Sequence, residues 1–300
     1  MATDPTMGKS SPDFYITRTI HPVGQGAFYS ESFYGEGQKC PCLTAVYDCG
    51  GNKTCCKTEI KALKRLDILF ISHFHDDHIN CVTELLKLNS NAYVFIPGVT
   101  HSRFIIDLVA NYFRSGTVSP SISFMMRCVP ALKKSKALPI HFSIQINQDF
   151  GSKSCGLTSG SFCAISPSAH ASILIQKEKC LWCYDTYYNG YNTSKEEKLI
   201  EKLSEEITSL KELLGKIDEY RDSEWYQEHL LVELSELAKS KEKIERIKKC
   251  YTDVFGKNHN SYSMIVHSHP VTEGKQKINC LFTGDSEPQS LINAVEQTKP

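Results

Sequence analysis

The sequence predicts an α/β protein, and three patterns support that class. The stretch from Leu66 to Ser72 is an apolar run interrupted only at Asp67 and ending in a serine, which is typical of a strand buried on both faces. Residues 82–88 are predicted as a helix and residues 92–97 as the next buried strand, so strand, helix and strand follow one another. Residues 194–249 are rich in Glu, Lys and Leu and contain one glycine, which indicates helices.

Strands are also predicted on both sides of this unit. Residues 15–20 alternate along their length as a strand does. Residues 44–51 form a strand that ends at a glycine break, and a basic helix follows at about residues 58–65. Further strands are expected at residues 141–146, 162–166, 172–184, 262–267 and 278–283.

The helical segment is predicted to be an antiparallel hairpin inserted into the α/β domain. Ser194 and Glu197 form a capping box, and Leu and Ile then recur at steps of three and four on both sides of a break at Asp222. The charged faces are expected to be solvated, with binding of a protein partner as the alternative. Three parts follow: the first part of the α/β domain, the hairpin and the rest of the domain, at residues 1–193, 194–250 and 251–300.

Composition limits the classes of partner. The 34 basic residues balance the 34 acidic ones, so no overall field attracts nucleic acid, and such a substrate would need a local basic patch. No apolar run approaches the roughly 18–20 residues that span a bilayer. The N-terminus lacks the apolar core of a signal peptide. We therefore expect no membrane partner and a cytoplasmic location.

The 13 cysteines are an odd and high number. A secreted disulfide scaffold is usually short and even-numbered, so most of these cysteines are predicted to be reduced thiols. Cys40, Cys42, Cys55 and Cys56 lie close together in the sequence, and a structural zinc clip is the alternative for them, although the usual C-x₂-C pairs are missing.

A dense group of metal-competent side chains follows the buried strand. His73, His75, Asp77 and His78 place three imidazoles and a carboxylate within six residues. Burying these groups without a ligand would leave donors and acceptors unsatisfied. Imidazole and carboxylate suit Zn²⁺, with Mn²⁺ as the alternative. The sequence therefore predicts a divalent metal site.

This H-x-H-x-D-H pattern resembles that of the metallo-β-lactamase superfamily at every defining position. The resemblance implies a four-layer αβ/βα sandwich in which His73 and His75 hold one metal, and Asp77 and His78 hold a second. Thr283-Gly284-Asp285 is similar to the family's T-G-D motif, which makes Asp285 the implied bridging ligand. Asp77 and Asp285 are then the implied catalytic residues, because they would orient the reacting water.

At other positions the match to the family pattern is less complete. Asp48 matches the family's D-x-G turn, which supports the site without binding metal. For the third ligand of the first metal, His259 and His170 are both candidates, while His267 and His269 are expected at the surface. The family places a final histidine well after T-G-D, but this chain has none beyond His269. We therefore expect a fragment that lacks the last C-terminal unit and holds its second metal incompletely.

A narrower resemblance is to the nuclease-like domain of bacterial competence (DNA-uptake channel) proteins and to related defence-associated hydrolases. A V-G-Q-G turn at residues 23–26, the metal motif, an S-P strand end at 165–167, an asparagine-bearing strand start at 258–263 and T-G-D appear in that order. One departure is Ile79-Asn80-Cys81, where the family usually has two glycines after the last motif histidine.

The resemblance implies a zinc-dependent hydrolase, with a phosphodiesterase or nuclease acting on nucleic acid or a nucleotide as the first expectation. Arg127 and the lysines at 133, 134 and 136 are a candidate phosphate patch, with a solvated loop as the alternative. A second hypothesis is an effector or sensor module at the N-terminus of a larger antiviral-defence protein. A lactam or thioester hydrolase rests on fold analogy alone.

Overall fold

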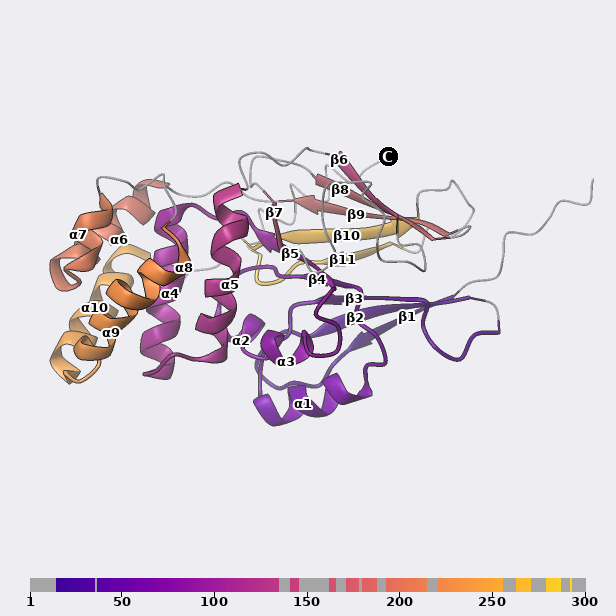
Figure 1. The fold of residues 1–300 in the computed structure, drawn as a ribbon, viewed down its shortest axis with the longest axis horizontal. Helices are drawn as coiled ribbons and strands as arrows, with labels where there is room; N and C mark the ends of the chain where they lie inside the picture. The colour runs from indigo at the N-terminus through magenta and orange to yellow at the C-terminus, as the bar shows by residue number, and fades with distance from the viewer. Residues whose placement is uncertain are drawn as a thin grey trace, which may run out of the picture.

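Two β-sheets face each other in the computed structural model, and helices cover one side of the first sheet (Figure 1). The structure describes residues 15–35, 37–134, 141–145, 162–165, 171–177, 180–187, 193–214, 221–255, 263–270, 279–286 and 292. The fold is therefore mixed α/β, as the sequence predicts.

The first sheet has the strand order β1-β2-β3-β4-β5-β7. Its first two pairings are antiparallel and the next three are parallel. The apolar run from Leu66 to Ser72 supplies the central strand β4, buried at all three of its positions. The strands are β1 Tyr15–Ile20, β2 Tyr29–Tyr34, β3 Leu43–Tyr47, β4 Ile68–Phe70, β5 Tyr93–Pro97 and β7 Phe162–Ile165.

The second sheet has the order β11-β10-β9-β8-β6. The stretch predicted at 172–184 is two antiparallel strands, β8 and β9. β10 pairs antiparallel with both β9 and β11, which brings the end of the described chain back to the sandwich. The strands are β6 His141–Gln145, β8 Ala171–Lys177, β9 Cys180–Tyr187, β10 Ile265–Pro270 and β11 Cys280–Phe282.

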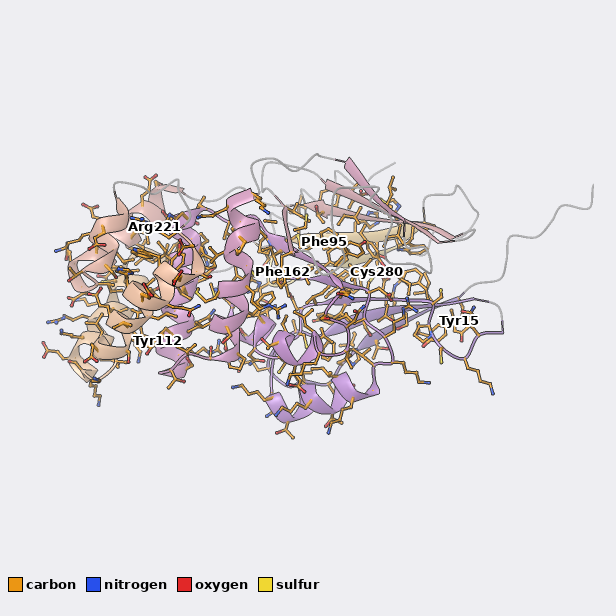
Figure 2. All side chains as sticks on the ribbon, viewed as in Figure 1. Tyr15, Phe95, Tyr112, Phe162, Arg221 and Cys280 are labelled. Carbon is orange, nitrogen blue, oxygen red and sulfur yellow. The ribbon has the colours of Figure 1, made fainter. Side chains whose placement is uncertain are left out.

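Two apolar cores hold these layers together. One lies between the sheets and includes Phe95, Trp182 and Tyr184. The other lies between the first sheet and the helices and includes Phe104 and Tyr112. Figure 2 shows Phe95 at the sheets and Tyr112 among the helices.

The helices of the first half begin with α1 at Lys53–Ala62, earlier than the predicted residues 58–65. The reason is a cap: the Asn52 side chain accepts hydrogen bonds from the backbone N–H groups of Thr54 and Cys55. Sequence patterns did not predict β2 or the two long helices α4 and α5. The remaining helices here are α2 Asp76–Ile79, α3 Val82–Leu85, α4 His101–Ser115 and α5 Pro120–Lys134.

The segment predicted as a two-helix hairpin is a group of shorter helices. Its apolar residues belong to the same core as Phe104 of α4 and do not bury only against one another. Tyr251 donates a hydrogen bond of 2.6 Å to the Ile106 carbonyl, and His101 lies 2.6 Å from the Tyr226 hydroxyl. The expected boundary at residue 250 lies inside a helix. The elements are α6 Thr193–Glu206, α7 Ser209–Leu214, α8 Ser223–Trp225, the π-helix η2 Tyr226–Leu231, α9 Val232–Leu237 and α10 Lys241–Phe255.

The described elements thus stack as helices, first sheet and second sheet. Within these described ranges, no helix combines the length and the apolar character needed to cross a membrane.

Candidate metal centre

The metal motif lies directly after β4, where three segments of backbone approach closely. A Cβ atom on Gly50 would come within 2.3 Å of the Asp77 carbonyl oxygen, and one on Gly26 within 2.8 Å of the same atom. The Cys49 N–H donates to the His78 carbonyl at 2.8 Å. The backbone at Gly26 and Gly50 therefore packs directly against the motif, which leaves no room for a side chain at either position.

Asn80 takes part in the same packing. Its side-chain oxygen accepts from the Gly51 N–H, and its side-chain amide donates to the Gly51 carbonyl, each at 3.1 Å. The Asn80 side chain therefore ties the end of the motif to the loop after β3.

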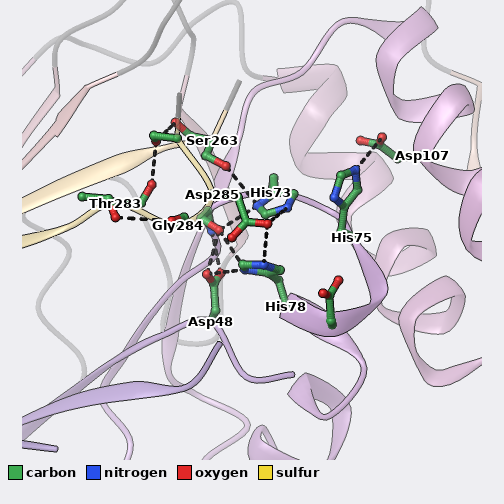
Figure 3. Close-up of polar contacts among 12 residues, drawn as sticks. Asp48, His73, His75, His78, Asp107, Ser263, Thr283, Gly284 and Asp285 are labelled. Atoms are coloured by element: carbon green, nitrogen blue, oxygen red, sulfur yellow. Dashed lines mark hydrogen bonds and ion pairs between the residues drawn. The ribbon is translucent and has the colours of Figure 1, made fainter. Parts of the chain in front are cut away.

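His73, His78 and Asp285 meet at the ends of strands from both sheets (Figure 3). The Asp285 Oδ2 atom lies 3.4 Å from His78 Nε2 and 3.9 Å from His73 Nε2. One metal-binding atom from each residue lies within 4.8 Å of the others. Gly284 has φ +52°, and a Cβ there would come within 2.7 Å of the Ser72 side chain, so the T-G-D turn needs glycine to bring Asp285 to this place.

Asp48 supports the motif through hydrogen bonds to its carboxylate. Its φ of +53° lies in the left-handed region, which among residues with side chains Asp and Asn adopt most readily. Its carboxylate accepts from the Ser72 N–H and the Ser72 hydroxyl, each at 2.7 Å, and from His78 Nδ1 at 2.9 Å. This pairing fixes the His78 ring with its Nε2 facing Asp285, which is the usual role of a carboxylate behind a metal-binding histidine.

The tautomer of His73 follows from its neighbours. Since the Ser72 hydroxyl donates to Asp48, its oxygen is an acceptor for His73 Nδ1, 2.9 Å away. The Ser263 hydroxyl lies 3.2 Å from the same nitrogen. The proton is thus placed on Nδ1, and the Nε2 lone pair faces Asp285. Burial, followed by the charges of His75 and His78, lowers the pKa of His73 well below its usual value, so the ring is neutral and suited to bind a metal.

His78 and Asp285 are electrostatically coupled. Burial by itself would lower the pKa of His78, but Asp48 and Asp285 outweigh it and raise that pKa to about 10. The hydrogen bond from His78 in turn lowers the pKa of Asp285. Without a cation, the His78 proton balances the two carboxylates. A divalent cation would replace that proton, because metal ligands bind in their deprotonated forms.

His75 and Asp77 lie beside this cluster with other partners. The His75 and His73 ring centroids are 4.4 Å apart, while His75 Nε2 lies 4.0 Å from the buried Asp107 carboxylate. Arg103 pairs with the same Asp107 oxygen at 3.0 Å. Asp77 Oδ1 lies 3.4 Å from the half-exposed Arg114 guanidinium.

Several predicted residues have other outcomes. His259 and His170 lie outside the described residues. His267, expected at the surface, is buried, and His269 is only partly exposed. Cys40, Cys42, Cys55 and Cys56 do not form a metal-binding group in the described part of the chain. Lys133 and Lys134 end α5, and Lys136 is outside the described residues.

The structure also adds residues that sequence reasoning missed. Asp107, Arg103, Arg114 and Ser263 all contact the motif or its support. Ser263 ends the stretch 258–263, which was predicted only as a strand start, so it was the one residue of the four with a sequence signal. The other three lie on α4, which was not predicted.

Comparisons with known proteins add no family to this geometry. Neither protein-family models nor curated protein sequences give a match to this chain.

Proposed function

We propose that this chain is a metal-dependent hydrolase of the metallo-β-lactamase type, with a phosphodiester as its substrate. The observation that carries the proposal is the meeting of His73 Nε2, His78 Nε2 and Asp285 Oδ2 at the ends of strands from two facing sheets. Two imidazole nitrogens and a carboxylate oxygen are a donor set that suits Zn²⁺. The facing sheets with helices over the first one are compatible with the proposed sandwich.

His73, His78 and Asp285 would hold the ion, and the resemblance implies that His75 and Asp77 of the same motif would complete two sites. A bound divalent ion lowers the pKa of water and polarises the bond to be cleaved. The chain's own part is to orient each donor atom. The Asp48 carboxylate accepts a hydrogen bond from His78 Nδ1, and the Ser72 hydroxyl oxygen accepts one from His73 Nδ1, so the Nε2 atom of each ring faces Asp285.

Asp285 is also placed to handle a proton. Its side chain is 41% exposed, so it faces the space from which water and substrate would approach. Because His78 stabilises its charged form, the carboxylate is ionised at neutral pH and accepts a hydrogen bond from water. This orienting role is the catalytic role that we propose for Asp285, and the resemblance implies the same role for Asp77.

The position of Arg114 favours an anionic substrate. Its side chain is 53% exposed and its guanidinium lies beside Asp77. Guanidinium groups bind phosphate oxygens through two parallel hydrogen bonds. The balanced overall charge gives no general attraction for polyanions. The proposal is therefore a local phosphodiester contact at the metal centre, in a nucleotide or a nucleic-acid strand.

Metal content tests the first half of the proposal. The purified chain should carry zinc or manganese, and His73→Ala combined with His78→Ala should lower bound metal far more than His229→Ala, an exposed histidine on η2. Fewer than about 0.2 ions per chain in gently purified, folded protein would sink the proposal, given the affinity of such sites.

Substrate class is tested separately with zinc-loaded protein. An aryl phosphodiester should be cleaved, and Arg114→Ala should raise KM while leaving bound zinc unchanged. If a β-lactam or a thioester is cleaved and the phosphodiester is not, the metal-dependent hydrolase stands and the phosphodiester assignment is wrong.

A further inference from the structure

Four more metal-competent side chains share one face of the second sheet. Side chains alternate along a strand. On β9 and β10 the even-numbered positions enter the core between the sheets, including Trp182, Tyr184 and Val266. Cys183, Asp185, His267 and His269 therefore point to the opposite face. In the antiparallel register His267 is opposite Asp185 and His269 is opposite Cys183, so the four form a square.

Three of these side chains already contact one another. His269 Nε2 lies 2.8 Å from one Asp185 oxygen, and Cys183 Sγ lies 3.4 Å from the other. The ligand atoms of all three are within 4.8 Å of one another. In a tetrahedral site with metal–ligand bonds of about 2.0–2.3 Å, ligand atoms are about 3.3–3.8 Å apart. Small side-chain rotations would therefore bring the three to one ion.

Two hydrogen bonds orient this group from behind. His269 Nδ1 donates to the Pro270 carbonyl at 3.1 Å, which leaves Nε2 as the atom that faces Asp185. The Ser172 hydroxyl donates to Asp185 at 2.5 Å. Such bonds fix the tautomer and direction of a metal-binding histidine and the position of a carboxylate.

His267 supplies an independent observation. It is 9% exposed, and its Nδ1 atom has no hydrogen-bond partner among the described residues. Its ring stacks on that of His269, with centroids 4.6 Å apart. A buried polar nitrogen without a partner is costly, and native structures with one call for an explanation such as an ion.

We propose that Cys183, Asp185 and His269 form a second divalent-cation site, separate from the first, with His267 as the fourth ligand. Thiolate and imidazole favour zinc over magnesium or calcium. The four residues come from β9 and β10, so the ion would join these two strands next to β11, which leads to Asp285, and its role would be structural. The site is independent of the proposed hydrolase function.

Cobalt(II) is the probe, because it reports a thiolate ligand by a charge-transfer band. The donors of the first site are nitrogen and oxygen only, so such a band would come from the site that contains Cys183. Whole wild-type protein loaded with Co²⁺ should show a thiolate-to-cobalt charge-transfer band. Cys183→Ser should remove that band. Cys280→Ser on β11 of the same sheet is the matched control and should keep it. Zinc analysis should give one ion fewer per chain for Cys183→Ser than for wild type.

Two further variants keep the test decisive if Cys183→Ser does not fold. Asp185→Asn preserves the shape of the side chain and should weaken cobalt binding at this site at least tenfold. His267→Ala should weaken binding and alter the ligand-field spectrum, while the thiolate band persists. If no thiolate band appears in folded wild-type protein, or if the band is unchanged in the Cys183 or Asp185 variant, the proposal is wrong, and Asp185–His269 is a simple ion pair.

Discussion

The two sides of the metal motif are supported by different parts of the molecule. On one side, Asp48 after β3 holds His78 at 2.9 Å. On the other, His75 lies 4.0 Å from Asp107 of α4, which packs against α6 of the helical segment. The first support is built from strands and turns of the α/β fold alone. The second depends on residues 193–255, so the helical segment contributes to the surroundings of the motif.

The largest effect is expected from a change that disrupts the support of the motif on its strand side. Gly50→Ala should destabilise the protein by about 3 kcal/mol or more and lower its metal content, since the added Cβ would lie 2.3 Å from the Asp77 carbonyl and backbone atoms cannot move aside cheaply. Urea unfolding and zinc analysis measure both. Gly116→Ala is the control: its φ is +69° with nothing within 4 Å, so only about 1–2 kcal/mol of backbone strain is expected. Equal effects of the two changes would contradict the close approach.

A pH effect tests the helical side. Burial raises the pKa of Glu196 on α6 from 4.5 to about 7, against opposing effects of Arg103 and Thr100. The folded state therefore keeps a proton that the unfolded state has released, and stability falls as pH rises between these two values, by up to about 3 kcal/mol. In Glu196→Gln this loss should be absent. Unfolding free energies at pH 5 and 7.5 measure it, and parallel pH curves for the two proteins would refute it.

The two supports can be compared directly. Asp48→Asn should lower zinc affinity about 10- to 100-fold, because the amide cannot stabilise the His78 ring as the carboxylate does. Asp107→Asn should have a smaller effect, since its 4.0 Å distance to His75 is longer than a hydrogen bond. Competition with a chelator gives both affinities. A larger loss for Asp107→Asn would reverse the ranking of the two sides.

The smallest effect is expected at the exposed rim. Arg114→Ala should change the free energy of unfolding by less than about 1 kcal/mol, because its pair with Asp77 is solvent-exposed on the arginine side. Thermal unfolding checks this, and a loss of several kcal/mol would show that Arg114 has a structural role.

The motif was predictable because its donors are contiguous in sequence and follow an apolar strand. The α/β class was predictable from the same strand. The helical hairpin was misread because steps of three and four mark an apolar helix face without saying what that face packs against; Leu203 lies in a core shared with α4. The square on β9 and β10 was missed because strand register, and not sequence distance, brings Asp185 to His267.

The shared helical core also has a consequence for synthesis of the chain. Helix α4 ends at Ser115, but Leu199, one of the residues that complete its core, follows 84 residues later. At about 5–20 residues per second, the nascent chain exposes an apolar helix face for roughly 4–17 seconds. The surroundings of the metal motif are completed later still, because Ser263 and Asp285 follow Leu199 in the chain. A chaperone that recognises exposed apolar helices would meet this protein in that interval, before the proposed metal ligand Asp285 has been made.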